Sequence, residues 1–68
     1  MSFETTEELA RMNAPFGKEL VLQNVIYEGG LGLLRLRIKE GKRFTMLDLD
    51  PNTAAQLSKI LSEWQQQQ

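Results

Sequence analysis

The stretch LLRLRIKEGKRFTMLDLDP, residues 33–51, decides the fold of this chain. Its first half alternates apolar and charged residues, so Leu34, Leu36 and Ile38 face one side of a predicted strand. Gly41 opens a predicted two-residue hairpin turn of type II′, because glycine adopts a positive φ at little cost. The turn sets a register in which the apolar faces of both strands coincide, and a shift by one residue would mismatch them.

This register predicts how the two strands of the hairpin pair. The predicted pairs are Glu40 and Arg43, Lys39 and Phe44, Ile38 and Thr45, Arg37 and Met46, Leu36 and Leu47, Arg35 and Asp48, and Leu34 and Leu49. The aliphatic residues therefore share one face of the hairpin, and the basic residues share the other face with Phe44 and Met46.

A helix is predicted directly after this hairpin, over residues 51–64. Asp50 is the N-cap candidate, and Pro51 suits the first helical position. An apolar stripe recurs at helical spacing, made of Ala54, Leu57, Ile60, Leu61 and Trp64. We interpret Trp64 as a core residue, because it lies on this stripe. The glutamines of residues 65–68 are expected to fray.

The start of the chain carries the signals of a short helix. Thr5 and Glu8 have the spacing of a capping box, and Phe3 lies near the position of a hydrophobic staple. Pro15 and Gly17 are helix-stop signals. Residues 18–28 follow and predict a strand with apolar side chains on both faces, a pattern that requires cover on both sides. The glycine-rich stretch EGGLG, residues 28–32, then predicts a turn.

Together these elements predict one small α+β domain over residues 1–68. Residues 1–17 hold a short N-terminal helix and a connection, and residues 18–50 form a three-stranded antiparallel β-meander. The meander packs on the C-terminal α-helix of residues 51–64, and residues 65–68 form a frayed tail. A single core is marginal at this length, so such chains often depend on disulfides, a metal or a partner subunit.

Composition narrows the chemistry that this chain can perform. The sequence has no cysteine and no histidine, which excludes disulfides and argues against a zinc or copper site. It also lacks the commonest catalytic base and the best nucleophile, so we predict no catalytic residues, no cofactor and no metal. Asp48 and Asp50 share a strand face, but pairing with Arg35 and helix capping account for them.

The distribution of apolar residues also bears on localisation. The sequence contains no run of 18 apolar residues, and residues 1–10 are acidic and polar. We therefore expect no transmembrane span and no signal peptide, and we predict a cytoplasmic protein that does not bind a membrane.

Basic residues concentrate on one face of the predicted hairpin. Five of the eight lysines and arginines fall within residues 35–43, although the net charge is −1. The candidate interaction face comprises Arg35, Arg37, Lys39, Phe44 and Met46. Three interpretations remain open: a protein interface, in which Met, Arg and aromatic residues are enriched, a solvated face, or a surface that stacks and binds single-stranded nucleic acid.

At LRLRIKEGKRFTMLDLDP, residues 34–51, the chain resembles a family of short, uncharacterised proteobacterial proteins, over about residues 14–64. This resemblance implies no activity. The stretch TMLDLDPNTAAQLSKIL, residues 45–61, is also similar to the end of the PC4-like transcriptional coactivator domain, in which a last strand leads through a short acidic turn into a C-terminal helix. That similarity implies dimerisation and single-stranded DNA binding on the sheet. The chain departs from it by its three predicted strands instead of four and by the absence of a basic N-terminal arm.

The sequence therefore predicts a non-catalytic protein-interaction module rather than an enzyme. Residues 18–28 carry apolar side chains on both faces, and a single C-terminal helix covers only one face. The uncovered face predicts self-association as a homodimer or binding of an unknown protein partner. The alternative is a single-stranded nucleic-acid-binding protein that uses the basic face of the sheet.

Overall fold

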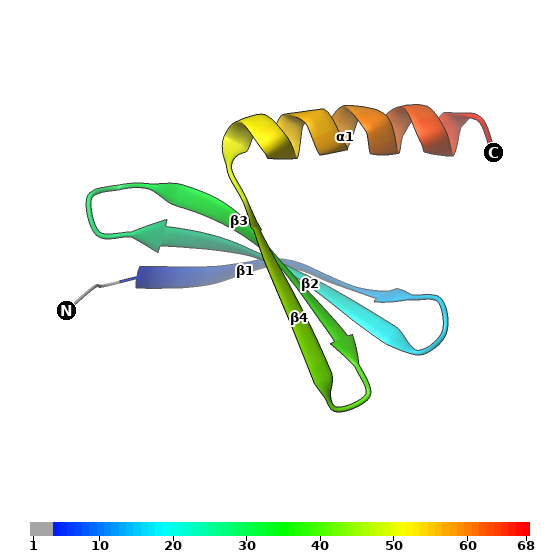
Figure 1. Ribbon diagram of the computed structural model, residues 1–68, viewed down its shortest axis with the longest axis horizontal. Coiled ribbons are helices and arrows are strands. Elements are labelled where there is room, and N and C mark those ends of the chain that lie inside the picture. The colour runs from blue at the N-terminus through cyan, green and yellow to red at the C-terminus, as the bar shows by residue number, and fades with distance from the viewer. Residues whose placement is uncertain (1–3) are drawn as a thin grey trace.

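The computed structural model describes residues 4–68, which form an antiparallel sheet followed by one helix (Figure 1). The elements in chain order are β1 (Glu4–Ala14), β2 (Lys18–Tyr27), β3 (Gly32–Glu40), β4 (Arg43–Leu49) and α1 (Pro51–Gln66). The strands lie in the order β1-β2-β3-β4, so each strand pairs only with its neighbours in the sequence. The described part measures 45 × 30 × 15 Å.

The predicted N-terminal helix is wrong, because this segment is strand β1. Thr5 and Glu8, the predicted capping box, pair instead with Ile26 and Gln23 of β2. Strand pairing gives the backbone of β1 hydrogen-bond partners, whereas an isolated two-turn helix is only marginally stable. The sheet therefore has four strands and not three, and α1 is the only helix within residues 4–68. The predicted staple residue Phe3 lies outside the described residues.

The residues interpreted as a helix stop form a hairpin turn. Residues 15–17 connect β1 to β2, and Phe16 and Gly17 have positive φ values of 66° and 72°. Only glycine adopts this conformation readily, so the backbone at Phe16 is strained. The pairing of β1 with β2 shifts between Glu8 and Ala10, which indicates a β-bulge at Leu9.

The register predicted for the hairpin of residues 33–49 is confirmed. Each predicted pair occurs between β3 and β4, from Glu40 opposite Arg43 to Leu34 opposite Leu49. Gly41 has a φ of 60°, as the predicted turn requires. The strand predicted from residue 18 is also confirmed as β2, and it lies between β1 and β3.

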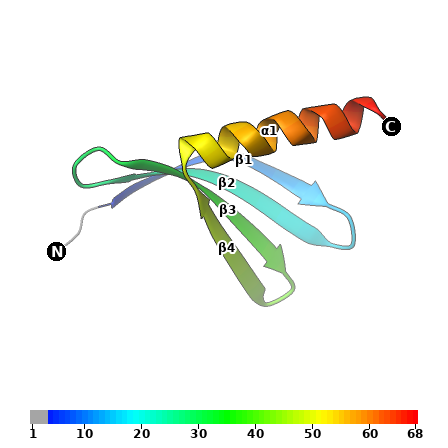
Figure 2. The ribbon, with the colours of Figure 1, turned by 45° about the horizontal axis from the view of Figure 1, so that its top comes forward.

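Helix α1 begins as predicted. The Asp50 side chain accepts a hydrogen bond of 2.7 Å from the Thr53 backbone N–H, and Pro51 occupies the first turn. The helix continues to Gln66, past the predicted end at residue 64. It lies on one side of the sheet and packs against β3 and β4 (Figure 2).

The two faces of the sheet differ in composition. The helix face, on which α1 lies, comprises Met12, Leu20, Leu22, Leu34, Leu36, Ile38, Leu47 and Leu49. The basic face, on the opposite side, includes Val21, Val25, Tyr27, Leu33, Arg35, Arg37, Lys39, Phe44, Met46 and Asp48, together with Glu8, Arg11 and Glu19. Within residues 4–68, the buried apolar residues are Val21, Val25 and Leu49. Two of these three lie on the face that has no helix.

Candidate interaction surfaces

One half of the basic face is closed by a network of polar side chains around Arg35. The Arg35 guanidinium donates hydrogen bonds of 2.8 and 3.1 Å to the two carboxylate oxygens of Asp48 and one of 3.3 Å to the Tyr27 hydroxyl. The Glu4 carboxylate lies 3.9 Å away. Only 19% of the Arg35 side chain is exposed. This arginine therefore holds the sheet together and is not a free cation.

The same network covers Val25. In the register of β2 and β3, Arg35 lies opposite Gln23, and Val25 is the next residue on that face before Tyr27. Val25, which is 0% exposed, therefore lies on this face between the hydrogen-bonded pair Arg35 and Tyr27 and directly opposite Leu33. Long polar side chains can exclude water from an apolar surface through their hydrocarbon and ring atoms, and they act here in place of a second layer.

The other half of the basic face is open and lies near the β3–β4 hairpin. The guanidinium carbon of Arg37 lies 4.2 Å from the centre of the Phe44 ring, and the Lys39 ammonium nitrogen lies 5.9 Å from it. Both are within the range of cation–π attraction. Phe44 is 49% exposed, and Met46 beside it is exposed as well. The structure thus brings four of the five predicted site residues together here, while Arg35 belongs to the closed half.

The charges on this open half are not neutralised by neighbouring acids. Within residues 4–68, no ion pair involves Arg37, Lys39 or the turn residue Lys42. Glu19 lies opposite Lys39 in the register, but its carboxylate binds Arg11 at 2.7 Å. The hairpin tip therefore concentrates positive charge on a chain whose net charge is −1.

Hydrogen bonds lower the pKa values of three carboxyl groups of the sheet and its helix. The bond from Arg35 lowers the pKa of Asp48, and the bond from Arg11 lowers the pKa of Glu8. The hydrogen bonds with Thr53 lower the pKa of Asp50. In each case the charged form accepts the bond and is thereby favoured. All three acids therefore take part in structural contacts within the chain.

A second candidate surface is the helix groove, an apolar groove between α1 and the helix face. It encloses about 270 Å³ and is lined by Met12, Leu20, Leu22, Leu34, Leu36, Leu49, Ala54, Leu57, Ser58 and Leu61. Apart from the serine, every lining side chain is apolar. The groove contains apolar residues of β1, β2 and β3, yet α1 packs closely only on β3 and β4. The helix therefore covers the groove incompletely.

The apolar stripe of α1 is exposed along most of its length. No residue of α1 is buried, and only Ala54 and Leu57 are half-buried. Leu61 is 57% exposed and Trp64 is 62% exposed. The prediction that Trp64 packs in the core is therefore wrong for the single chain. The spacing of the stripe is helical as predicted, but the sheet meets only its first turns.

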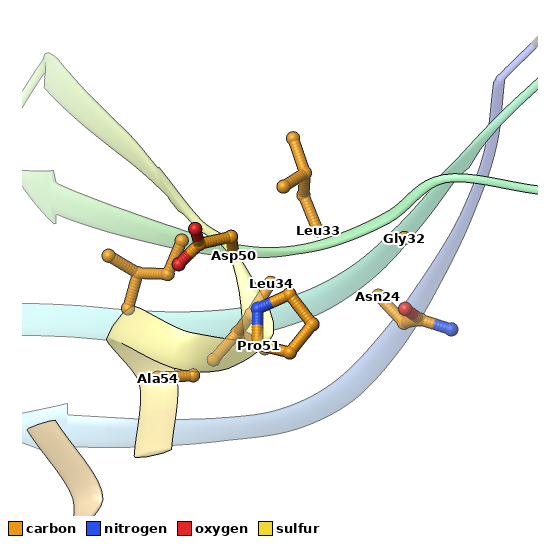
Figure 3. Close-up of a pocket in the computed structure, with 8 residues that line it drawn as sticks. Asn24, Gly32, Leu33, Leu34, Asp50, Pro51 and Ala54 are labelled. Atoms are coloured by element: carbon orange, nitrogen blue, oxygen red, sulfur yellow. The ribbon is translucent and has the colours of Figure 1, made fainter. Parts of the chain in front are cut away.

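Another hollow lies where β4 turns into α1 (Figure 3). It encloses about 280 Å³ and is lined by Asn24, Gly32, Leu33, Leu34, Leu49, Asp50, Pro51 and Ala54. Figure 3 shows the Asn24 amide pointing away from Pro51 and Ala54, and the Asp50 carboxylate is occupied with the helix cap. Small-molecule sites hold a few polar groups that converge on the ligand, and the polar groups of this hollow do not converge.

Two further properties describe the chain. Across residues 4–68, acidic side chains do not gather in a group of three or more that could hold a metal ion. The one helix of this part of the chain is not long and apolar enough to cross a membrane.

These features define a small α+β domain with an antiparallel meander, one C-terminal helix and two open surfaces. The chain belongs to a family of unknown function (DUF6967), whose sequence profile matches residues 3–67. This membership confirms the predicted relationship to an uncharacterised family. The proteobacterial origin and the similarity to the PC4-like domain stay predictions. No curated protein and no solved structure matches the chain.

Proposed function

We propose that this protein is a non-catalytic interaction module that self-associates, and that a second copy covers the helix groove. One observation carries the proposal: α1 has an apolar stripe, but none of its residues is buried. Water-exposed leucine, isoleucine and tryptophan side chains beside an apolar groove form a patch of the kind that marks an interface.

A second copy is the occupant because one chain carries both complementary parts. The groove needs an apolar element, and the outer half of α1 is such an element, with Glu63 as its only charge after Lys59. A two-fold arrangement places the stripe of each copy in the groove of the other, so both are covered at once. Pairing also enlarges a core that comprises few buried residues in one chain and cannot be supported by disulfides.

Sedimentation velocity across the micromolar range tests this proposal. We expect a particle of at least twice the chain mass of 7.8 kDa. Leu61→Glu places a charge in the groove and should weaken association at least tenfold, since an unpaired charge is costly in an apolar interface. Ser62→Glu is the matched control, because it adds the same charge on the side of α1 away from the stripe. A wild-type chain that sediments as a 7.8 kDa monomer at every concentration would contradict the proposal.

Single-stranded nucleic-acid binding is the second candidate, and the open half of the basic face favours it. An exposed Phe44 ring between Arg37 and Lys39 offers a base a stacking surface beside cations for the phosphates. Arg37, Lys39 and the turn residue Lys42, which form no ion pair within residues 4–68, add to it. The net charge of −1 opposes it, and we expect only weak binding at physiological salt.

Titration of a labelled, unstructured oligonucleotide at two salt concentrations separates the two candidates. Phosphate contacts would lower log K by roughly 0.7 per contact for each tenfold rise in salt. Phe44→Ala would then weaken binding by about tenfold or more if a base stacks there. Phe16→Ala removes an exposed ring from a different hairpin and is the control. Tight, salt-sensitive binding that Phe44→Ala abolishes would make nucleic-acid binding the leading function.

A further inference from the structure

The two outer strands of the sheet are protected unequally against further pairing. Strand β1 carries Glu4, Glu7, Glu8 and Arg11 and is interrupted by the bulge at Leu9. Charges and bulges of this kind prevent another strand from pairing at a sheet edge. Strand β4 is the opposite edge of the sheet (Figure 2). It pairs with β3 without any register shift. Its residues 44–47 are Phe-Thr-Met-Leu, all exposed and uncharged.

We propose that β4 pairs antiparallel with β4 of a second copy, about a two-fold axis at Thr45, so that the two sheets become one. This inference rests on the proposed self-association and adds a second interface to it. The helix groove and the β4 edge are separate surfaces, because α1 lies toward Met12 of β1 and Leu20 of β2 and away from the outer edge of β4. Two separate two-fold interfaces on one chain produce particles of more than two chains.

The hairpin turn determines which backbone groups are free for this pairing. In an antiparallel hairpin closed by two residues, the closing pair Glu40 and Arg43 exchanges both hydrogen bonds, and bonded pairs alternate from there. Arg43, Thr45 and Leu47 therefore direct their backbone groups toward β3. The backbone N–H and C=O groups of Phe44 and Met46 point outward from the sheet.

Charge complementarity favours a second copy, and the residue that Phe44 meets selects the register. Strand β4 is preceded by Lys42 and ends near Asp48, so an antiparallel copy brings opposite charges together at both ends. With the axis at Thr45, Lys42 lies opposite Asp48 of the second copy, and Phe44 lies opposite Met46 of the second copy. An axis at Met46 would instead place the Phe44 ring against the carboxylate of Asp48, which Arg35 holds at 2.8 Å.

This pairing also joins the open halves of two basic faces. Arg37, Lys39 and Phe44 of both copies would lie on the same side of the continuous sheet, because a two-fold axis perpendicular to a sheet keeps each face on its own side. The surface that carries the cation–π contacts is thereby doubled in length, and Met46 contributes to its centre.

Met46→Pro tests the edge directly, with Met46→Ala as the matched control. Both variants remove the methionine side chain, but only proline removes the outward N–H, and an outer strand accepts proline there without loss of its pairing to β3. We expect wild-type particles of four or more chains by sedimentation velocity. Met46→Pro and Leu61→Glu should each reduce them to two chains, and the double variant should be monomeric. Met46→Ala should stay in the larger state.

A second variant keeps the test valid if Met46→Pro does not fold, which far-UV circular dichroism reveals. Lys42→Glu changes an exposed turn residue and sets like charges against each other at both ends of the paired strands. We expect at least tenfold weaker assembly beyond the dimer. A wild-type dimer that Leu61→Glu dissociates, but that Met46→Pro and Lys42→Glu leave intact, would overturn edge pairing and leave the proposed function standing. A wild-type monomer would overturn both.

Discussion

The two faces of strand β2 differ in how well their apolar residues are buried. On the basic face, Val21 and Val25 are buried although no helix lies over them. On the helix face, Leu20 and Leu22 are larger, yet they are only half-buried below α1. The difference lies in what covers each face. On the basic face, Val25 lies between side chains of β2 and β3, with Leu33 directly opposite it and Arg35 hydrogen-bonded to Tyr27 beside it. The helix is joined to the sheet at one end and covers the other face incompletely. Apolar content alone therefore does not determine burial in a chain of this size.

The largest expected difference between the two faces is in the free energy of unfolding of the variants Val25→Ala and Leu22→Ala. Val25→Ala should lower the free energy of unfolding by about 2 kcal/mol, because it removes two buried methyl groups and leaves a cavity. Leu22→Ala should cost less than ~1 kcal/mol at low protein concentration, since its side chain lies in the open groove. Urea denaturation measures both values.

Protein concentration sharpens the same comparison. The loss of unfolding free energy caused by Leu22→Ala should grow as protein concentration rises, because only the assembled protein covers the groove. The loss of unfolding free energy caused by Val25→Ala should not change with concentration. Equal losses for both variants at every concentration would mean that the two faces of β2 are equally covered in the isolated chain.

Asp50→Ala should have a smaller effect, limited to the helix side. The variant removes the acceptor of the Thr53 N–H and lowers the thermal midpoint by several degrees, with a loss of helical circular dichroism. Asp50→Asn retains an acceptor and should stay close to wild type. Val25 methyl resonances should keep their chemical shifts in both variants. A large shift of these resonances would show that α1 supports the basic face after all.

The pH dependence of stability should show the smallest effect, and it reports on the closed half of the basic face. The hydrogen bond from Arg35 lowers the pKa of Asp48 in the folded chain below its ordinary value of 3.8. The unfolded chain therefore takes up the proton first as pH falls. The stability from this contact is present above the unfolded pKa and is lost as pH falls through the folded pKa.

Asp48→Asn should flatten this acid dependence, measured as urea midpoints at pH values above and below the unfolded pKa. Glu8 and Asp50, whose pKa values are also lowered, contribute the slope that remains. An unchanged slope in Asp48→Asn would mean that the carboxylate does not hold Arg35 over Val25 in solution.

The part of the fold that could be predicted is the part in which local signals agree. Gly41 fixes the turn, and the alternation on both sides of it allows only one register with coincident apolar faces, so every pair between β3 and β4 is correct. Asp50 and Pro51 likewise specify the start of α1 through their own backbone chemistry.

The N-terminal strand could not be predicted from local signals, because they favour the wrong state. Thr5 with Glu8 matches a capping box, and Pro15 with Gly17 matches a helix stop as well as a turn. The deciding contribution is pairing with β2, which is a tertiary effect. The apolar residues on both faces of residues 18–28 predict cover above and below the sheet, and they do not reveal a further strand beside it.

The sequence predicted which residues form the candidate site, but it did not predict that the site divides into a closed half and an open half. Alternation placed Arg35, Arg37 and Lys39 on one face, together with Phe44 and Met46, and the register confirms this placement. The contact of Arg35 with Tyr27 depends on side-chain reach across two strands, which spacing does not reveal. The helix groove depends on the angle at which α1 leaves β4, and no residue pattern specifies that angle.

Each strand pairs only with its neighbours in the sequence, and this topology affects how quickly the molecule folds. Every strand pair is joined by a short connection, at residues 15–17, 28–31 and 41–42. Chains whose contacts are local in sequence fold fast, because little loop entropy is lost before each pairing stabilises the next. The sheet should therefore form in a rapid first-order phase, whereas coverage of the helix groove by a second copy depends on encounter and is second-order. Refolding at rising protein concentration should leave the first rate constant unchanged and accelerate only the second phase.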